Sequence, residues 1–490
     1  MIPVPGFEER RVAVFGLGRS GITAARALHA GGAIPILWDD GVSGRMQAEA
    51  EGFAVEDLAT ADWSNFAALV LSPGAPLTHP KPHWTVDKAK AAGVEIIGDI
   101  ELFARALAYT PESLRPKVAA ITGTNGKSTT TALIGWVLKR AGLKVAIGGN
   151  IGIGVLALPA PVEVQVYVIE VSSYQLDLTT HFAPDVAILT NITPDHLDRH
   201  GGMEGYVAAK RRLFQQMSPD KVALIGVDDD WGWDIVGELN ARRLRVSTIT
   251  TRTPGGDTRP SLQPAQIDAE RPDLRPAFDQ GRFIIMDATG GCLTADGVRI
   301  GDLAGARSLP GRHNAQNAAF AYAAARAVGV AHDAAVEGLM TFPGLAHRME
   351  EVGRLGSVRF INDSKATNAD AARQALSSYR SSFWIAGGRA KTGGIEDLQD
   401  VFPRVARAYL IGEAAEDFAA TLGDTPHSLC GDMATAVAAA AADAARAGGE
   451  QVVLLSPACA SFDQFPDFEV RGEAFRAAVL NLGATTSSHG

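Results

Sequence analysis

A glycine-rich loop that ends in a lysine and two hydroxyl residues is the stretch of the chain best suited to chemistry. It runs Thr122-Gly123-Thr124-Asn125-Gly126-Lys127-Ser128-Thr129, after the apolar run 118–121 and before a helical pattern of apolar residues. Glycines let backbone N–H groups turn toward phosphate oxygens, and a helix N-terminus adds partial positive charge. Lys127 can neutralise the outer phosphates, and the Ser128 hydroxyl can reach a magnesium ion. We therefore predict that this loop binds ATP.

Two side chains further along could hold a metal ion. Glu170 ends the apolar run 166–169, and a carboxylate at a strand end near a phosphate loop is well placed to bind magnesium. His196 follows the run 186–189 after a short turn, between Asp195 and Asp198, which suits a metal contact. A solvated strand end and a structural histidine are the simpler alternatives. By pattern alone, Lys210 is a solvent-facing helix lysine.

A second glycine loop lies near the N-terminus. Gly16-Leu17-Gly18-Arg19-Ser20-Gly21 separates the apolar runs 11–15 and 34–38, and acidic residues follow about 20 residues beyond the glycines. This pattern is weak by itself, because it fits NAD(P), FAD or another nucleotide. Alone it would suggest a dehydrogenase.

The elements that must position these residues form three α/β modules, which we predict at 1–110, 111–344 and 345–490. Short apolar strands alternate with helical segments, which is typical of mostly parallel sheets. The predicted strands are 11–15, 34–38, 67–71, 118–121, 166–169, 186–189, 222–225, 283–286, 358–361, 383–386, 408–411 and 452–455. An alanine-rich helix is predicted at 433–447. The polar segment 250–281 is expected to be a mobile surface excursion.

Composition narrows the class of protein. At 490 residues, with 46% hydrophobic and 20% charged residues, two to four globular domains are expected. A net charge of −10 argues against nonspecific binding to nucleic acid or a membrane surface. Three scattered cysteines suit a reducing cytoplasm. The N-terminus lacks the regions of a signal peptide, and no apolar run approaches the ~20 residues that span a bilayer. We expect a cytoplasmic protein without membrane insertion.

The ATP loop resembles that of the Mur ligase family, because it is shorter than the usual G-x-x-x-x-G-K-[ST] pattern. Further motifs match the family in order: 191–198 around His196, 311–314 (Gly-Arg-His-Asn), 347–348 (His-Arg) and 362–368 (Asn-Asp-Ser-Lys-Ala-Thr-Asn). The last of these and the run 456–465 (Ser-Pro-Ala-Cys-Ala-Ser-Phe-Asp-Gln-Phe) look like the branch that adds D-glutamate to UDP-N-acetylmuramoyl-L-alanine.

The resemblance implies an activity and a fold. The expected enzyme is a monomeric, ATP-dependent amide ligase that acts through an acyl phosphate in peptidoglycan precursor synthesis. Its domains would be a Rossmann-like N-terminal domain for the UDP substrate, a central P-loop ATPase-type domain, and a C-terminal Rossmann-like domain for the amino acid. Two Mg2+ ions and a carbamylated Lys210 are also implied.

The resemblance also assigns the site residues. The implied catalytic residues are Lys127, Glu170, His196, Lys210 and Arg348, and the implied metal ligands are Ser128, Glu170, His196 and Lys210. ATP would contact Gly123, Thr124, Asn125, Gly126, Lys127, Ser128, Thr129, Asn314, Asn317, Arg348, Asp363 and Lys365. The UDP substrate would contact Gly16, Leu17, Gly18, Arg19, Asp39, Asp40, Ser72, Gly74 and Asn150. D-Glutamate would contact Thr367, Lys391, Ser461 and Phe468.

Three alternatives stay open. Another ligase of the family would add L-alanine, a diamino acid, a dipeptide, or glutamate to folate; the long N-terminal module argues against the folate enzyme, and an Asp-Asn-Pro-Arg-type motif is absent. A catalytically inactive nucleotide-binding homologue is disfavoured by the intact Lys127, Glu170, His196 and Lys210. A Rossmann oxidoreductase would leave the loop 122–129 unexplained.

Overall fold

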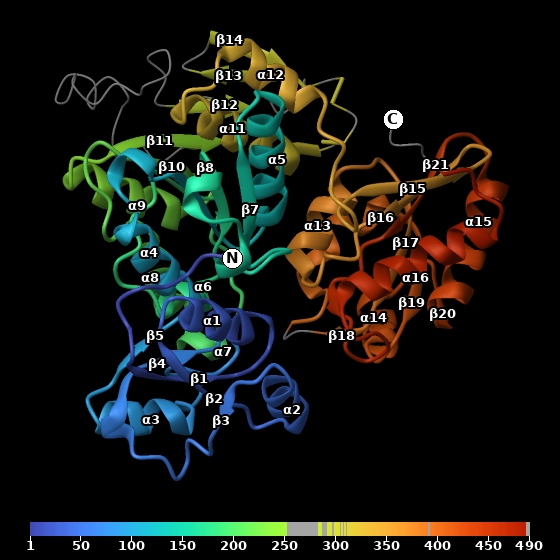
Figure 1. The fold of residues 1–490 in the computed structure, drawn as a ribbon. Helices are drawn as coiled ribbons and strands as arrows, with labels where there is room; N and C mark the ends of the chain where they lie inside the picture. The colour runs from blue at the N-terminus through green and yellow to red at the C-terminus, as the bar shows by residue number, and fades with distance from the viewer. Residues whose placement is uncertain are drawn as a thin grey trace. The chain divides into compact units, whose positions relative to one another are not determined.

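The chain forms two compact units with mixed α/β structure. The computed structural model describes residues 1–251, 283–286, 292–295, 298–303, 305–306, 308–309, 311–390 and 393–486. The first unit is Met1–Asp302 with Gln316–Leu339, and the second is Leu303–Ala315 with Met340–Gly490 (Figure 1). The predicted α/β class is confirmed, and each of the three predicted ranges contains its own main sheet.

The first unit begins with a five-stranded parallel sheet in the order β3-β2-β1-β4-β5. Its strands are β1 (Arg11–Phe15), β2 (Ile34–Trp38), β3 (Ala54–Val55), β4 (Phe66–Leu71) and β5 (Glu95–Ile97). The helices are α1 (Arg19–Ala30), α2 (Val42–Ala50), α3 (Trp84–Ala91) and α4 (Asp99–Tyr109). The first glycine loop therefore connects β1 to α1, as the pattern predicts.

A nine-stranded sheet forms the rest of the first unit, in the order β14-β13-β12-β11-β10-β9-β6-β8-β7. The strands are β6 (Lys117–Thr122), β7 (Val145–Gly149), β8 (Val166–Glu170), β9 (Val186–Leu189), β10 (Val222–Gly226), β11 (Arg245–Thr250), β12 (Phe283–Met286), β13 (Cys292–Ala295) and β14 (Val298–Asp302). β6 to β12 run parallel, whereas β13 and β14 pair antiparallel at one edge.

Helices connect or follow these strands and carry several candidate site residues. They are α5 (Lys127–Arg140), α6 (Ser173–Asp177), α7 (Leu197–His200), α8 (Met203–Arg211), α9 (Asp230–Ala241), α11 (Gly311–Ala327) and α12 (His332–Met340). β6 ends where the ATP loop begins, and α5 starts at Lys127. Ile121 of β6 pairs with Glu170 of β8, so two predicted site segments leave the sheet at the same level.

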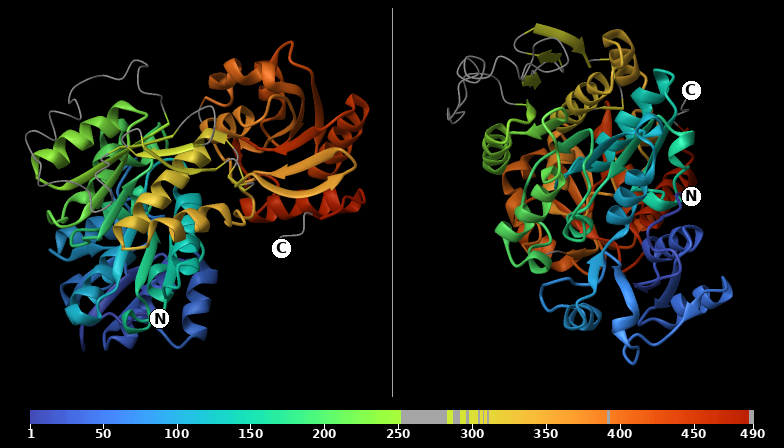
Figure 2. Two further views of the ribbon diagram at one scale, coloured as in Figure 1. Left: turned by 90° about the horizontal axis from the view of Figure 1, so that it is seen from above. Right: turned by 60° about the vertical axis from the view of Figure 1, so that its left-hand side comes forward.

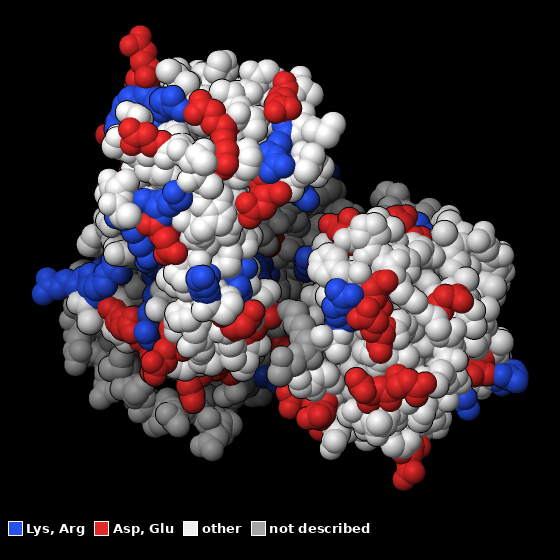
Figure 3. All heavy atoms as spheres, turned by 90° about the horizontal axis from the view of Figure 1, so that it is seen from below, with Lys and Arg blue, Asp and Glu red and all other residues white. Residues whose placement is uncertain are grey.

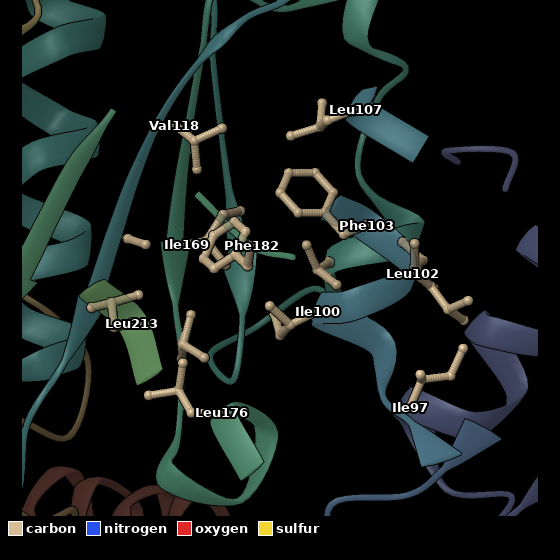
Figure 4. Close-up of a cluster of buried hydrophobic side chains, with 14 of the residues drawn as sticks. Ile97, Ile100, Leu102, Phe103, Leu107, Val118, Ile169, Leu176, Phe182 and Leu213 are labelled. Carbon is tan, nitrogen blue, oxygen red and sulfur yellow. The ribbon is translucent and has the colours of Figure 1, made fainter. Parts of the chain in front are cut away.

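One buried apolar cluster joins the two sheets of the first unit. Ile100, Leu102 and Phe103 of α4 pack with Val118, Ile169 and Phe182 of the central segment (Figure 4). Phe103 makes an edge contact with Tyr167, with ring centroids 5.2 Å apart. Burial of such aromatic and aliphatic surface is the main favourable term in folding, so α4 binds the N-terminal sheet to the central one.

The second unit has a six-stranded sheet in the order β15-β16-β21-β17-β19-β20. Its strands are β15 (Glu350–Leu355), β16 (Val358–Asn362), β17 (Ser382–Gly387), β19 (Val405–Ile411), β20 (His427–Gly431) and β21 (Gln451–Leu455), with a small pair of β18 (Arg389–Ala390) and β22 (Cys459–Ala460). The helices are α13 (Ala369–Ser377), α14 (Ala415–Leu422), α15 (Met433–Ala447) and α16 (Phe468–Asn481) (Figure 2).

This sheet is buried on both faces. Phe383 and Ile385 of β17 pack with α15 and α16, whereas the intervening Trp384 packs into a second cluster with α13 and α14. Side chains alternate between the two faces of a strand, so a continuous apolar run is what a sheet covered on both sides requires.

Two predictions fall outside the described residues: most of the polar segment 250–281, and Lys391. Within the described ranges, no helix has the length and apolar character to cross a bilayer. On the face shown in Figure 3, basic and acidic side chains are intermixed.

Candidate functional site

Gly123 and Gly126 give the predicted ATP loop its shape. Their φ angles are 140° and 82°, and Gly126 is the N-cap of α5. A Cβ atom at Gly123 would lie 1.9 Å from Thr190 Oγ1, and one at Gly126 would lie 2.6 Å from Asn317 Oδ1. Both the positive φ and the close neighbours require glycine. The loop therefore leads directly into the N-terminus of α5, as the sequence predicts.

Lys127 and Lys210 donate hydrogen bonds to the same oxygen, the carbonyl of Gly123. The Nζ···O distances are 3.0 and 2.7 Å, and Lys127 also donates to Thr124 O at 2.8 Å. Lys210 is 1% exposed, so the solvent-facing lysine expected from pattern alone is wrong. Burial and the positive charge of Lys127 lower the pKa of Lys210 well below its ordinary value. The ATP loop thus has a buried amine beside it.

Glu170 is a buried carboxylate with one oxygen available for a cation. It is 2% exposed, and its Oε1 accepts a hydrogen bond from Asn150 Nδ2 at 2.9 Å. Its Oε2 is buried and has no hydrogen-bond partner among the described residues. Buried polar atoms are nearly always satisfied, so an oxygen in this state suits a hard cation such as Mg2+. Ser128, also predicted as a ligand, is buried in the first turn of α5.

His196 stands just before α7 in a left-handed backbone conformation, with φ of 54°. Its Nε2 lies 3.4 Å from Asp195 Oδ2, and its ring contacts Tyr174 with centroids 5.0 Å apart. The side chain is 42% exposed. Tyr174 and Asp195 therefore both contact the imidazole, which is partly exposed to solvent.

Residues that sequence reasoning did not assign hold the ATP loop in place. Asn191 accepts from the Asn125 amide at 2.9 Å and donates to the Asn125 carbonyl at 3.1 Å. Thr190 Oγ1 donates to the same carbonyl at 2.7 Å, and Tyr206 Oη lies 3.0 Å from Thr124 Oγ1. Asn191 lies within a motif quoted for the family resemblance, but nothing in the pattern around Thr190 or Tyr206 indicated this role.

The N-terminal glycine loop is organised around Asp39. Its carboxylate accepts from the Leu17 amide at 2.6 Å and the Gly41 amide at 2.7 Å. A Cβ at Gly16 would lie 2.5 Å from Ser72 Cβ, so the turn after β4 packs directly on the loop. Arg19 donates to Gly152 O at 2.6 Å. The structure therefore brings together the predicted residues that follow β1, β2 and β4. Gly152, the partner of Arg19, lies two residues along the chain from Asn150.

The remaining predicted contacts for the UDP substrate are less enclosed. Asp40 lies 3.2 Å from His83 Nε2 and its side chain is 61% exposed. A Cβ at Gly18 would meet nothing within 4 Å, and Gly74 is exposed. An open glycine backbone of this kind can approach a phosphate group closely.

Asp99 is a buried acid that sequence reasoning missed. Its oxygens accept from Gln175 Nε2 at 3.0 and 3.2 Å and from the Ile100 amide at 2.9 Å. Burial raises its pKa, and a hydrogen bond with the Ser20 side chain opposes that shift. Asp99 therefore contacts both Ser20 of the N-terminal glycine loop and Gln175 of α6. This helix begins three residues after Glu170. At a helix start it looks like an ordinary N-terminal acid.

In the second unit, Asp363 lies at the end of β16 and accepts two hydrogen bonds. Ser456 Oγ donates at 2.9 Å and the Met349 amide at 3.2 Å. Burial raises the pKa of Asp363 to about 7, while these hydrogen bonds and the positive charges of Arg348 and Arg471 oppose the shift. Asp363 and Arg348, both predicted ATP ligands, are thus near enough to interact.

Arg471, which was not predicted, links Ser364 to Cys459 beside the predicted amino-acid residue Phe468. It is 1% exposed, its Nε donates to Ser364 Oγ at 3.0 Å, and one terminal nitrogen donates to Ser364 O and Cys459 O at 2.8 and 3.0 Å. Ser364 Oγ in turn donates to Phe468 O at 2.8 Å, and Lys365 Nζ lies 3.9 Å from the Phe468 ring centroid. In the sequence, Arg471 is one more charged residue of a helix.

The other predicted residues are placed as follows. Ser461 is buried and Thr367 half-buried in the second unit. Asn314 and Asn317 both lie on α11 and are buried; Asn317 Oδ1 accepts from Thr130 Oγ1 of α5 at 3.0 Å. Within the described residues, no group of three His, Cys, Asp or Glu side chains forms a ready metal site.

Comparison with known proteins places these features in a family. Residues 121–325 match the model of the Mur ligase middle domain, and residues 347–459 match that of the Mur ligase, glutamate ligase domain. The fold is similar to the crystal structure of UDP-N-acetylmuramate-alanine ligase from Thermotoga maritima, with a TM-score of 0.58 and 15% identity over 96% of this chain and 99% of the other.

Full-length relatives are much more similar in sequence. The UDP-N-acetylmuramoylalanine--D-glutamate ligase of Caulobacter sp. (strain K31) is 61% identical over 99% of this chain and 98% of the relative. The protein of the same name from Phenylobacterium zucineum (strain HLK1) is 57% identical over 98% of each chain. This chain belongs to the Mur ligase family.

Proposed function

We propose that this protein is the ATP-dependent ligase that joins D-glutamate to UDP-N-acetylmuramoyl-L-alanine in peptidoglycan synthesis. The observation that carries the proposal is the 61% identity, over 99% of the chain, to a relative named for that reaction. The fold and the family-model matches agree with an amide-bond ligase that uses ATP.

The reaction has two chemical steps. The carboxylate of the alanyl group attacks the γ-phosphorus of ATP, which forms an acyl phosphate and releases ADP. The amine of D-glutamate then attacks the acyl carbon, loses a proton, and expels inorganic phosphate as the amide forms. Lys127 and Arg348 would stabilise negative charge on the transferred phosphoryl group, since such catalysis is mostly positioning and electrostatic stabilisation.

We assign ATP to the loop Gly123–Thr129 together with Asn314, Asn317, Arg348, Asp363 and Lys365. The positive φ of two loop glycines and the Lys127 ammonium support the phosphate part of this assignment. The buried carboxylate of Asp363 supports a role in accepting hydrogen bonds from ribose hydroxyls.

We assign magnesium to Ser128, Glu170, His196 and Lys210. The unpaired buried Oε2 of Glu170 supports the assignment, because it gives a hard cation an oxygen ligand. A bound Mg2+ would supply charge stabilisation for the phosphoryl oxygens. Lys210 would act as a carbamate: its buried amine, with a lowered pKa, can react with CO2 and so exchange a positive charge for anionic oxygens. Two ions are proposed.

We assign the UDP substrate to residues 1–110 and the amino acid to residues 345–490, with ATP held mainly by residues 111–344. The UDP residues are Gly16, Leu17, Gly18, Arg19, Asp39, Asp40, Ser72, Gly74 and Asn150. The D-glutamate residues are Thr367, Lys391, Ser461 and Phe468. We further propose a monomer that works in the cytoplasm, where ATP and nucleotide-linked sugars are available; light scattering on the purified protein tests the monomer.

A product assay tests the proposal. The protein is incubated with ATP, Mg2+ and UDP-N-acetylmuramoyl-L-alanine, and with D-glutamate, L-glutamate, L-alanine or a diamino acid in turn. We expect phosphate release and a new UDP-linked product by mass spectrometry only with D-glutamate. Turnover with a different amino acid would replace the proposed specificity, and no turnover with any would favour an inactive homologue.

A further inference from the structure

His200 is a buried histidine that the reaction described above does not use. Its side chain is 2% exposed, and both ring nitrogens have partners: Nδ1 lies 3.1 Å from Asp177 Oδ2, and Nε2 lies 3.0 Å from Ser173 Oγ. The order of carboxylate, imidazole and hydroxyl resembles a nucleophilic triad. However, Ser173 is 3% exposed, so a substrate carbonyl has no access to its hydroxyl. The hydrogen bond with Ser173 and the close contact with Asp177 instead restrain the ring.

Two tyrosines contact this ring. Tyr174 stacks on His200 with centroids 5.4 Å apart and an interplanar angle of 18°, and Tyr206 lies at 5.4 Å with an angle of 50°. Aromatic pairs at these separations attract one another beyond the burial of their surface. Because Ser173 and Asp177 hold the imidazole at its two nitrogens, its ring gives both tyrosines a fixed surface to pack against.

Each tyrosine in turn contacts a residue of the proposed site. The Tyr174 ring lies 5.0 Å from the His196 ring, and the Lys210 Nζ lies 4.4 Å from the Tyr206 ring centroid. The hydroxyl of Tyr206 also lies 3.0 Å from Thr124 Oγ1 in the ATP loop. The Tyr174 ring is thus one of the groups, together with Asp195, that contact the partly exposed His196 side chain.

We infer that His200 is a positioning residue that aligns His196 and Lys210 through the two tyrosine rings. The inference rests on the proposed ligase function, because it gives those two residues their purpose. The competing explanation is a core histidine that only stabilises α7. The two differ in what happens at His196 when the polar contacts of His200 are removed and the protein stays folded.

The test compares His200→Phe, which keeps an aromatic ring but loses both nitrogens, with His332→Phe. His332 also contacts a tyrosine, Tyr322, with its Nδ1 2.9 Å from the Tyr322 hydroxyl, and has no assigned role in the site. The readouts are kcat in the ligase assay and the NMR resonance of 13Cε1-labelled His196, assigned with His196→Gln. We expect His200→Phe to lower kcat by about 10-fold or more and to move that resonance, whereas His332→Phe changes neither.

Unchanged kcat, or a His196 resonance that does not move, would overturn the inference. If His200→Phe does not fold, Asp177→Ala decides: it removes the partner of Nδ1 at a side chain that is 24% exposed. We expect it to change kcat and the resonance in the same direction, and no change in either would overturn the inference. If the wild-type protein makes no amide, the proposed function fails, while the His196 resonance still reports whether His200 positions that ring.

Discussion

Removal of the Lys127 side chain should lower the catalytic rate while the protein stays folded. Its ammonium donates to carbonyls of its own loop and the residue is only half-buried, so Lys127→Ala should leave the core intact. We expect kcat to fall more than about 10-fold, a loss of over ~1.4 kcal/mol in transition-state stabilisation. Lys139→Ala, at an exposed position of the same helix, is the control. A Lys127→Ala enzyme above a tenth of wild-type kcat would exclude the phosphate-loop assignment.

The proposed carbamate on Lys210 predicts chemical rescue. Lys210→Ala should be nearly inactive, and added formate or acetate should restore part of the rate, because a small carboxylate can replace the missing anionic oxygens. The Lys127→Ala enzyme should gain nothing from the same additions, since it lacks a cation. Failure of every small carboxylate to restore activity would count against the carbamate.

Asp363 should make the stability of the protein depend on pH. Burial raises its pKa to about 7, whereas an aspartate in an unfolded chain has a pKa of about 3.9. Between these values the folded state keeps a proton that the unfolded state has lost. The free energy of unfolding should therefore fall as pH rises through this window, by up to about 1.4 kcal/mol per unit, and then level off.

Urea unfolding of the wild-type protein and of Asp363→Asn, at several pH values between about 5 and 8, measures this slope. The amide does not titrate, so the variant should lose this contribution. Asp333→Asn, at a fully exposed site of α12, should behave as the wild type. Equal slopes in all three proteins would show that Asp363 does not hold the extra proton.

The place of a residue in the fold could be inferred from the sequence where a motif surrounds it. Glu170 directly follows a predicted strand, and Gly126 and Ser128 lie in the loop and helix start that come after another, so their positions near the carboxyl ends of the strands could be inferred. His200 and Arg471 could not be found in this way, because both lie in helices where a polar residue is usually solvated. Only the fold shows that these two face inward.

At the scale of elements, apolar parallel strands were predicted well. β9, β12 and α15 have the predicted bounds, and β8 and β21 extend theirs by one residue. The strands that were not predicted include β13, β14 and β15, which pair antiparallel at the edges of their sheets. β15 has the sequence Glu-Glu-Val-Gly-Arg-Leu, and an edge strand with few buried side chains lacks the apolar run that marks a central one.

The two ends of α5 allow a matched test of the ATP loop. Gly126 precedes the helix with φ of 82° and Gly142 follows it with φ of 85°, so alanine at either position should cost about 1–2 kcal/mol from backbone strain. Only at Gly126 would the new Cβ also meet Asn317 Oδ1, whereas at Gly142 nothing lies within 4 Å. We expect Gly126→Ala to weaken ATP binding and to be the less stable variant in urea unfolding. Equal effects at both positions would mean that the Asn317 contact does not matter.

At the scale of the molecule, the three sheets fall within the predicted ranges, whereas compactness divides the described chain into two units. The α4 cluster explains why residues before 110 belong to the same unit as those after it, and no sequence pattern showed this. The second boundary, at Met340, lies close to Pro343-Gly344, where Gly344 has φ of 93°. Because glycine absorbs large backbone changes at low steric cost, we expect this dipeptide to act as a hinge.

Substrate binding should compact the protein in solution. The proposed ATP ligands are divided between the two units, and an acyl phosphate must be protected from water. We therefore expect the radius of gyration from X-ray scattering to decrease when an ATP analogue and the UDP substrate are added together. An unchanged radius at saturation, with full turnover after the hinge is locked by an engineered disulfide, would exclude closure.

The register of the central sheet restricts how this enzyme can evolve. Ile121 lies beside Glu170, and Thr122 beside Leu189. The carboxyl ends of β6, β8 and β9, where the proposed site residues lie, are therefore at the same level. One residue inserted in β8 would shift the carboxylate by about 3.3 Å and turn it to the opposite side of the sheet. Insertions and deletions should therefore be rare in these strands among descendants of this gene and common in the turns before the amino ends of the strands, such as 141–144. The carboxyl ends can change by substitution, whereas the turns at the amino ends can also accept insertions.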